Sequence, residues 1–158
     1  TLTQQALADY DQMREREGEK LAEDVRNRAS VIETLVGEVE KRSPERVAEY
    51  REKLLARMRE VLESTDIDET RIVTEAAIYA DKTAVDEETV RLRSHLHQLD
   101  GMLNEVKPVG RKLDFLVQEM NREANTIGSK ANDVEMAQTV VNIKSEIEKI
   151  REQIQNIE

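Results

Sequence analysis

Apolar residues recur at alternating intervals of three and four along most of this chain, and this spacing limits what it can fold into. The spacing is strictest in two stretches of the second half of the sequence. Those positions are Val85, Thr89, Leu92, Leu96, Leu99, Leu103 and Val106, and then Met136, Val140, Ile143, Ile147, Ile150, Ile154 and Ile157. Because an α-helix turns once in about 3.6 residues, each helix acquires one apolar stripe, which is buried against another helix. The sequence therefore predicts long, paired helices.

The composition supports an all-α class. With 5 glycines and 2 prolines in 158 residues, the chain has too few turn residues for the many short strands of a β-sandwich or barrel. We expect an elongated bundle of about five or six long antiparallel helices with coiled-coil-like pairing, forming one helical domain over residues 1–158. The chain has no cysteine, which excludes disulfides and thiolate metal sites and favours a cytoplasmic location. No apolar run is long enough to span a membrane.

Capping and turn-forming residues predict where the helices end. Ser43 followed by Pro44 has the pattern of a helix N-cap and first residue, so the first helix is expected to end near Arg42. Asn132, with Glu135 three residues later, has the spacing of a capping box for the last helix. The predicted helices cover residues 2–42, 44–62, 71–82, 85–106, 108–128 and 132–157.

Polar residues beside the apolar stripe form a candidate metal site. Glu88 and His95 lie two turns apart, roughly 10 Å, so they cannot chelate one ion directly. Glu119 and Glu123 are neighbours on the next predicted helix, and antiparallel packing could bring them to His95. Carboxylates with one imidazole suit Mg²⁺ or Mn²⁺. The alternative is an interhelical salt-bridge network with His95 at the edge of the core.

The overall charge argues against nucleic acid, but one window differs. The net charge is -10, which repels a phosphate backbone. Within residues 107–130, however, basic residues outnumber acidic ones. The same window carries a polar strip whose amide side chains are unfavourable for a helix and indicate a contact surface. The strip consists of Asp114, Gln118, Asn121, Asn125 and Thr126.

Four segments resemble the YicC-like endoribonuclease family. They are GRKLDFLVQEMNREANTIGSKAND (110–133), EKIREQIQNIE (148–158), MREREGEKL (13–21) and, after Arg71 and Glu75, DEETVRLRSHL (86–96). The resemblance covers nearly the whole chain. It implies a cytoplasmic bacterial endoribonuclease that depends on a divalent metal, acts on RNA and assembles as a homo-oligomer, a hexamer. Family members are about twice as long and have a strand-containing N-terminal region, so this chain resembles their C-terminal helical half.

The resemblance also carries site residues onto this chain by motif, including Glu87 and Asp114. The catalytic residues it implies are His95, Glu119, Arg122 and Glu123. The metal ligands, for Mg²⁺ or Mn²⁺, are Glu75, Glu88, His95, Glu119 and Glu123. The RNA-binding residues are Arg91, Asn121, Asn125 and Lys130, to which the basic window adds Arg111 and Lys112. The competing interpretation from another class is a non-catalytic helical module that holds an oligomer together as a scaffold.

Overall fold

A computed structural model describes residues 1–62, 67–105 and 110–157, and every regular element in these ranges is a helix. The helices are α1 (Leu2–Leu62), α2 (Glu69–Thr83), α3 (Asp86–Leu103), α4 (Gly110–Lys130) and α5 (Val134–Ile157). The predicted all-α class is confirmed, and five helices is the lower of the two numbers expected. None of the helices described is apolar over a stretch long enough to cross a membrane.

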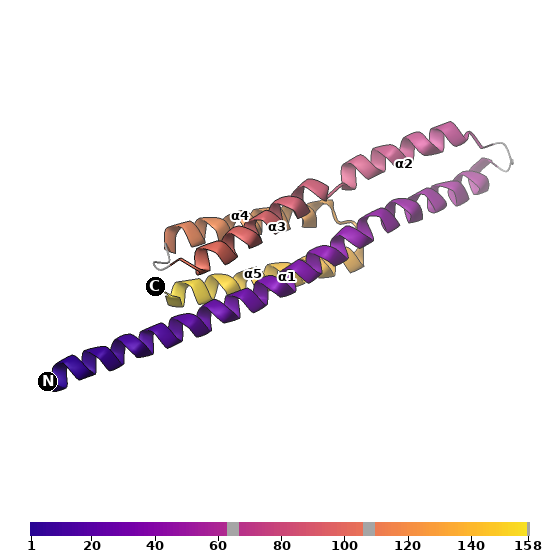
Figure 1. The fold of residues 1–158 in the computed structure, drawn as a ribbon. Helices are drawn as coiled ribbons and strands as arrows, with labels where there is room; N and C mark the ends of the chain where they lie inside the picture. The colour runs from indigo at the N-terminus through magenta and orange to yellow at the C-terminus, as the bar shows by residue number, and fades with distance from the viewer. Residues whose placement is uncertain (63–66, 106–109, 158) are drawn as a thin grey trace.

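The molecule is an elongated bundle arranged along α1 (Figure 1). Helices α3, α4 and α5 pack beside the middle of α1, where α1 and α4 each contact both α3 and α5. The pairs α1–α2, α3–α4 and α4–α5 run antiparallel, as predicted, whereas α3 follows α2 in the same direction along α1 (Figure 1). Helix α2 pairs with the last part of α1 as a hairpin beyond this four-helix body, and the first turns of α1 project beyond its other end.

The core of the body is formed by the predicted heptad positions. Leu92 and Leu99 of α3, and Ile143, Ile147 and Ile150 of α5, are all fully buried. Complete burial of one such aliphatic side chain contributes about 1.5–3 kcal/mol. Thr89, the one polar heptad position, is also buried, and its hydroxyl donates to the Asp86 carbonyl at 3.1 Å. Val106 and the side chain of Ile157 lie outside the described part of the chain.

Helix α1 continues through Pro44, so the predicted helix end at Arg42 and new start at Pro44 are wrong. Packing explains the continuity, because Val39 and Arg46, on either side of the proline, are both buried. Ion pairs also cross it: Arg42 contacts Glu49 at 2.7 Å and Glu45 at 3.4 Å. Tertiary contacts in the turns before and after Pro44 therefore outweigh the local capping signal.

The start of α5 also differs from the prediction by one residue. Asp133, and not Asn132, caps the helix, with its carboxylate accepting from the Met136 backbone N–H at 3.1 Å. Arg42 of α1 holds that carboxylate at 3.1 Å and lies 3.4 Å from Glu135.

The other predicted helix boundaries agree in part with the structure. The predicted break at residues 82–86 is confirmed, whereas α3 ends at Leu103 and α4 continues past Gly128. The predicted start at Pro108 lies outside the described residues.

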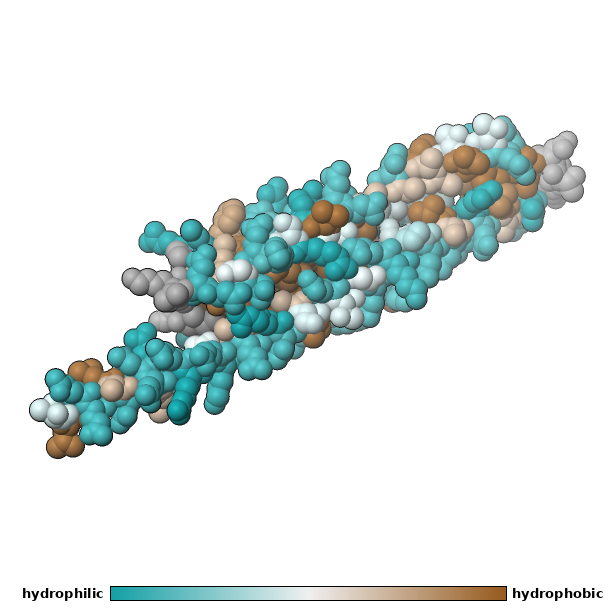
Figure 2. Space-filling view, viewed as in Figure 1, coloured by the Kyte–Doolittle hydropathy of each residue, from teal (hydrophilic) through white to brown (hydrophobic). Residues whose placement is uncertain are grey.

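Aromatic and polar contacts tie the hairpin to the body. The rings of Tyr50 (α1) and Tyr79 (α2) stack with centroids 4.0 Å apart. Arg46 donates to the Tyr79 hydroxyl at 2.7 Å, and that hydroxyl donates to the Asn132 side-chain oxygen at 3.3 Å. The visible face is mostly hydrophilic, and hydrophobic residues gather on the hairpin and at the tip of α1 (Figure 2).

Candidate functional site

Two carboxylates are almost fully buried where α3 packs on α4. Glu88 of α3 is 4% exposed and Glu123 of α4 is 6% exposed. A buried charge is costly unless it is paired and hydrogen-bonded. Both are paired across the helix boundary: Lys130 Nζ donates to Glu88 Oε1 at 2.7 Å, and Arg91 Nε donates to Glu123 Oε1 at 2.8 Å. We refer to Glu88, Arg91, Glu123 and Lys130 as the seam cluster.

The seam cluster is one connected group of charges. Arg91 Nη2 lies 3.7 Å from Glu88 Oε1, so this arginine links the two buried carboxylates. Its Nη1 also approaches the exposed Glu87 at 3.5 Å. Lys130 additionally donates to the Ala84 carbonyl at 2.9 Å, just before α3 begins. The interhelical ion-pair network considered from the sequence is therefore present, but His95, which that interpretation made a satisfied polar residue, takes no part in it in the described part of the chain.

The electrostatics of the cluster keep its charges in place. Burial, the largest single influence, raises the pKa of Glu88, but the hydrogen bonds from Lys130 and the backbone, together with the charges of Lys130 and Arg91, outweigh it, and the pKa lies below its ordinary value. The hydrogen bond to Glu123 raises the pKa of Arg91. Glu88 is therefore ionised and Arg91 is protonated at neutral pH. The cluster presents fixed charges where the polar edges of two helices meet.

Two buried polar atoms of α3 have no hydrogen-bond partner among the described residues. They are Oε2 of Glu88 and Nδ1 of His95. Buried polar atoms are nearly always satisfied in native structures, so such atoms are candidates for contact with a ligand, water or ion. The pairing of Arg91 with Glu123 fixes the antiparallel register, and it places His95 at the level of Glu119, which is half-buried.

The five predicted metal ligands do not form one group. Glu88 and His95 lie on α3, Glu119 and Glu123 lie on α4, but Glu75 is an exposed residue of α2 in the hairpin. Across the described ranges, no three His, Asp or Glu side chains come close enough together to hold a metal ion. The prediction of bound Mg²⁺ or Mn²⁺ stays a prediction.

The predicted RNA-binding residues divide between two surfaces. Arg91 and Lys130 belong to the seam cluster. Arg111, Lys112, Asn121 and Asn125 lie instead toward solvent on α4. Part of that surface is a shallow depression, lined by Gln118, Asn121, Arg122, Asn125, Thr126 and Ser129. The polar strip expected from the sequence is thus largely one solvent-facing surface of α4.

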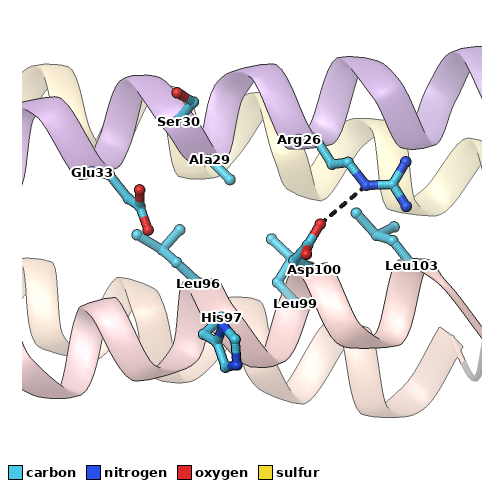
Figure 3. Close-up of a pocket in the computed structure, with 9 residues that line it drawn as sticks. All are labelled: Arg26, Ala29, Ser30, Glu33, Leu96, His97, Leu99, Asp100 and Leu103. Carbon is cyan, nitrogen blue, oxygen red and sulfur yellow. Dashed lines mark hydrogen bonds and ion pairs between the residues drawn. The ribbon is translucent and has the colours of Figure 1, made fainter.

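A second depression, between α1 and α3, was not anticipated from the sequence (Figure 3). Arg26 reaches from α1 to Asp100 of α3 at 3.0 Å and to Asn104 at 2.6 Å. His97, the second histidine, lines it but its ring turns away from α1. Arg26 and Asp100 are engaged with each other and the His97 ring turns away, so this depression does not gather a set of catalytic side chains. Only the packing of α1 on α3 creates it, and no local sequence signal marks it.

Comparisons with known proteins agree with the resemblance seen in the sequence. A family described as "Endoribonuclease YicC-like, C-terminal" matches residues 39–158, which include the whole seam cluster. A Clostridioides difficile protein named "Probable endoribonuclease YicC" is 51% identical over 97% of this chain and 53% of its own length. A Haemophilus influenzae protein of the same name is 38% identical over 96% of this chain and 52% of its own length. The chain spans about half the length of these curated relatives. It belongs to the YicC-like endoribonuclease family, whose C-terminal part it matches.

Proposed function

We propose that this chain is the helical part of a metal-dependent endoribonuclease and that its reaction is centred on the seam cluster. One observation carries the proposal: Glu88 and Glu123 are buried charges, linked through Arg91, in a chain whose relatives are named probable endoribonucleases. A purely structural role would not require the unpartnered oxygen of Glu88. Buried carboxylates held by charged partners, as Glu88 and Glu123 are, are common at catalytic sites.

The buried carboxylates fit a hard divalent cation. In proteins Mg²⁺ is commonly held by one or two carboxylates, with the remaining positions taken by substrate phosphate oxygens and water. Glu88 meets this requirement because it is ionised and its Oε2 is free of other partners in the described structure. Glu123 is the second carboxylate. When bound, the cation would neutralise phosphate charge and make a water molecule that it binds more acidic.

Other residues in and around the seam cluster have roles that follow from their chemistry. The Arg91 side chain is 47% exposed, so while its Nε holds Glu123 the outer edge of its guanidinium is available to a phosphate. His95 is the proton carrier, because an imidazole both accepts and donates a proton near neutral pH. Glu119, at the level of His95, shares that task as a ligand or base. Lys130 keeps Glu88 ionised, and Arg122 adds positive charge on α4.

RNA is the proposed substrate. The solvent-facing surface of α4 is proposed to bind the RNA beyond the seam cluster. Arg111 and Lys112 would neutralise phosphates, while Asn121 and Asn125 offer hydrogen bonds to ribose or bases. We also propose a homo-oligomer, a hexamer by family resemblance, in the cytoplasm.

A non-catalytic scaffold is the second candidate function, and the charge balance of the seam cluster favours it. Lys130 and Arg91 already compensate the two buried carboxylates, as a structural network would.

An RNA cleavage assay separates the candidates: the 158-residue chain and a full-length relative are each given a structured RNA with Mn²⁺, with Mg²⁺ or with EDTA. The proposed enzyme cleaves with either metal and stops in EDTA. Cleavage by the relative alone would show that the chain is a scaffold or a half-site.

A further inference from the structure

Phe115 is the only phenylalanine of the chain, and its side chain is 63% exposed on α4. Single exposed apolar residues are common on proteins, so its neighbours must decide whether it has a use. No other large apolar side chain of α4 is exposed in the described residues. An isolated aromatic is a poor basis for a protein–protein interface, which requires a contiguous apolar patch.

The surface around Phe115 carries more cations than anions and is rich in hydrogen-bonding groups; the acidic side chain on the same side is Glu119, four residues later. Residues four before and seven after it lie on the same side of a helix, and these are Arg111 and Arg122. Neither arginine, nor Lys112, forms an ion pair with a described residue. The shallow depression with its amide side chains begins one turn further along, at Gln118.

Arg111 and Lys112 are not explained by the stability of α4. The first turn of α4 contains no acidic residue, whereas Arg111 and Lys112 place positive charge where the helix dipole is already positive. Such an arrangement opposes helix formation. It is favourable when an anion lies against the surface.

We propose that Phe115 is a stacking platform for an unpaired RNA base, and that Arg111 and Arg122 bind the phosphates on either side of it. Along the helix axis, Arg111 lies roughly 6 Å and Arg122 roughly 10 Å from Phe115. Aromatic platforms flanked by cations are how proteins hold single-stranded nucleic acid. A duplex would not bind in this way, because its bases are already stacked and paired. The inference rests on the proposed function, since it names the form of RNA that the chain accepts.

The absence of tryptophan from the chain allows a direct test. Phe115→Trp introduces a single tryptophan at the platform, and Val73→Trp introduces one at a residue of α2, in the hairpin, that is 57% exposed, as a matched control. Each variant is titrated in EDTA with an unpaired oligouridylate and with an RNA duplex. Stacking quenches the tryptophan fluorescence of the Phe115→Trp protein with the unpaired strand and leaves that of the Val73→Trp protein unchanged. Phe115→Ala lowers the affinity for the unpaired strand about 5- to 100-fold.

The outcomes separate the platform from the proposed function. If the chain binds RNA but Phe115→Trp is not quenched and Phe115→Ala binds as the wild type does, the platform is wrong and the proposed function stands. If the wild-type chain binds neither RNA, its proposed contact with RNA fails, and the platform fails with it. If Phe115→Ala instead lowers the molecular mass in light scattering, the surface is a protein interface and the platform is overturned.

Discussion

At the scale of single residues, Glu88 keeps a full charge inside the molecule because Lys130 donates to it. Half of its carboxylate is satisfied by this contact, and the other oxygen has no partner among the described residues. The buried charge on Glu88 is tolerated only while the Lys130 ammonium group stays in place. Lys130 therefore holds the candidate ligand in its charged form, and it was predicted from the sequence as an RNA-binding residue without this contact.

Lys130→Met should destabilise the chain strongly. It leaves Glu88 buried without its cation, which costs about 2–4 kcal/mol in the free energy of unfolding. Urea denaturation measures the loss. The control is Lys149→Met, because Lys149 pairs with Glu146 on a more exposed surface and its loss should cost about 0.5 kcal/mol or less. Equal effects of the two substitutions would show that the Lys130–Glu88 pair contributes no more than a surface contact.

The lowered pKa of Glu88 predicts a dependence of stability on pH. Because the folded-state pKa lies below the ordinary value of 4.5, the pair contributes fully above that pH, and its contribution is lost as the pH falls toward the folded-state pKa. Thermal unfolding at decreasing pH should show this loss. Glu88→Gln cannot titrate at this position, so its melting temperature should fall less steeply in the same range. Parallel curves for the two proteins would contradict the shift.

At the scale of the helices, the spacing of apolar residues predicted which faces are buried, but local signals failed at Pro44, at Gly128 and at the start of α5. The spacing succeeds because the buried face is a property of each helix by itself. The Ser43–Pro44 signal fails because contacts of α1 with other elements hold the helix together across it. The choice between Asn132 and Asp133 is decided by Arg42, far away in sequence. Neither contact can be read from the residues nearby.

Pro44→Ala tests the continuity of α1. A proline inside a helix lacks the N–H that would bond to the Glu40 carbonyl, so alanine should raise the free energy of unfolding by about 1–3 kcal/mol. If Pro44 were instead the first residue of a separate helix, where its N–H would have no partner, the substitution would be neutral or slightly destabilising. Urea denaturation of the two proteins decides between these structures.

At the scale of the whole molecule, the relative placement of helices determines which candidate residues meet. The sequence analysis considered that antiparallel packing could bring Glu119 and Glu123 to His95; the packing is antiparallel, but the partner of Glu123 is Arg91. Glu75 was grouped with the other acidic residues, yet it lies on α2 in the hairpin. The spacing of apolar residues determines which face of each helix is buried. It does not determine the register between neighbouring helices, or which helix extends beyond the four-helix body. Both are set by packing of the assembled core.

The central proposal is that the α3–α4 seam carries metal-dependent cleavage of RNA, and Glu123→Gln in the full-length protein tests it most directly. Glu40→Gln is the matched control, because Glu40 of α1 pairs with Arg93 of α3 at 3.0 Å outside the seam cluster. Cleavage of a structured RNA with Mn²⁺ is measured for each, with helical content checked by circular dichroism. We expect Glu123→Gln to lose about 100-fold or more in rate, while Glu40→Gln cleaves like the wild type. Wild-type cleavage by a folded Glu123→Gln protein would contradict the proposal.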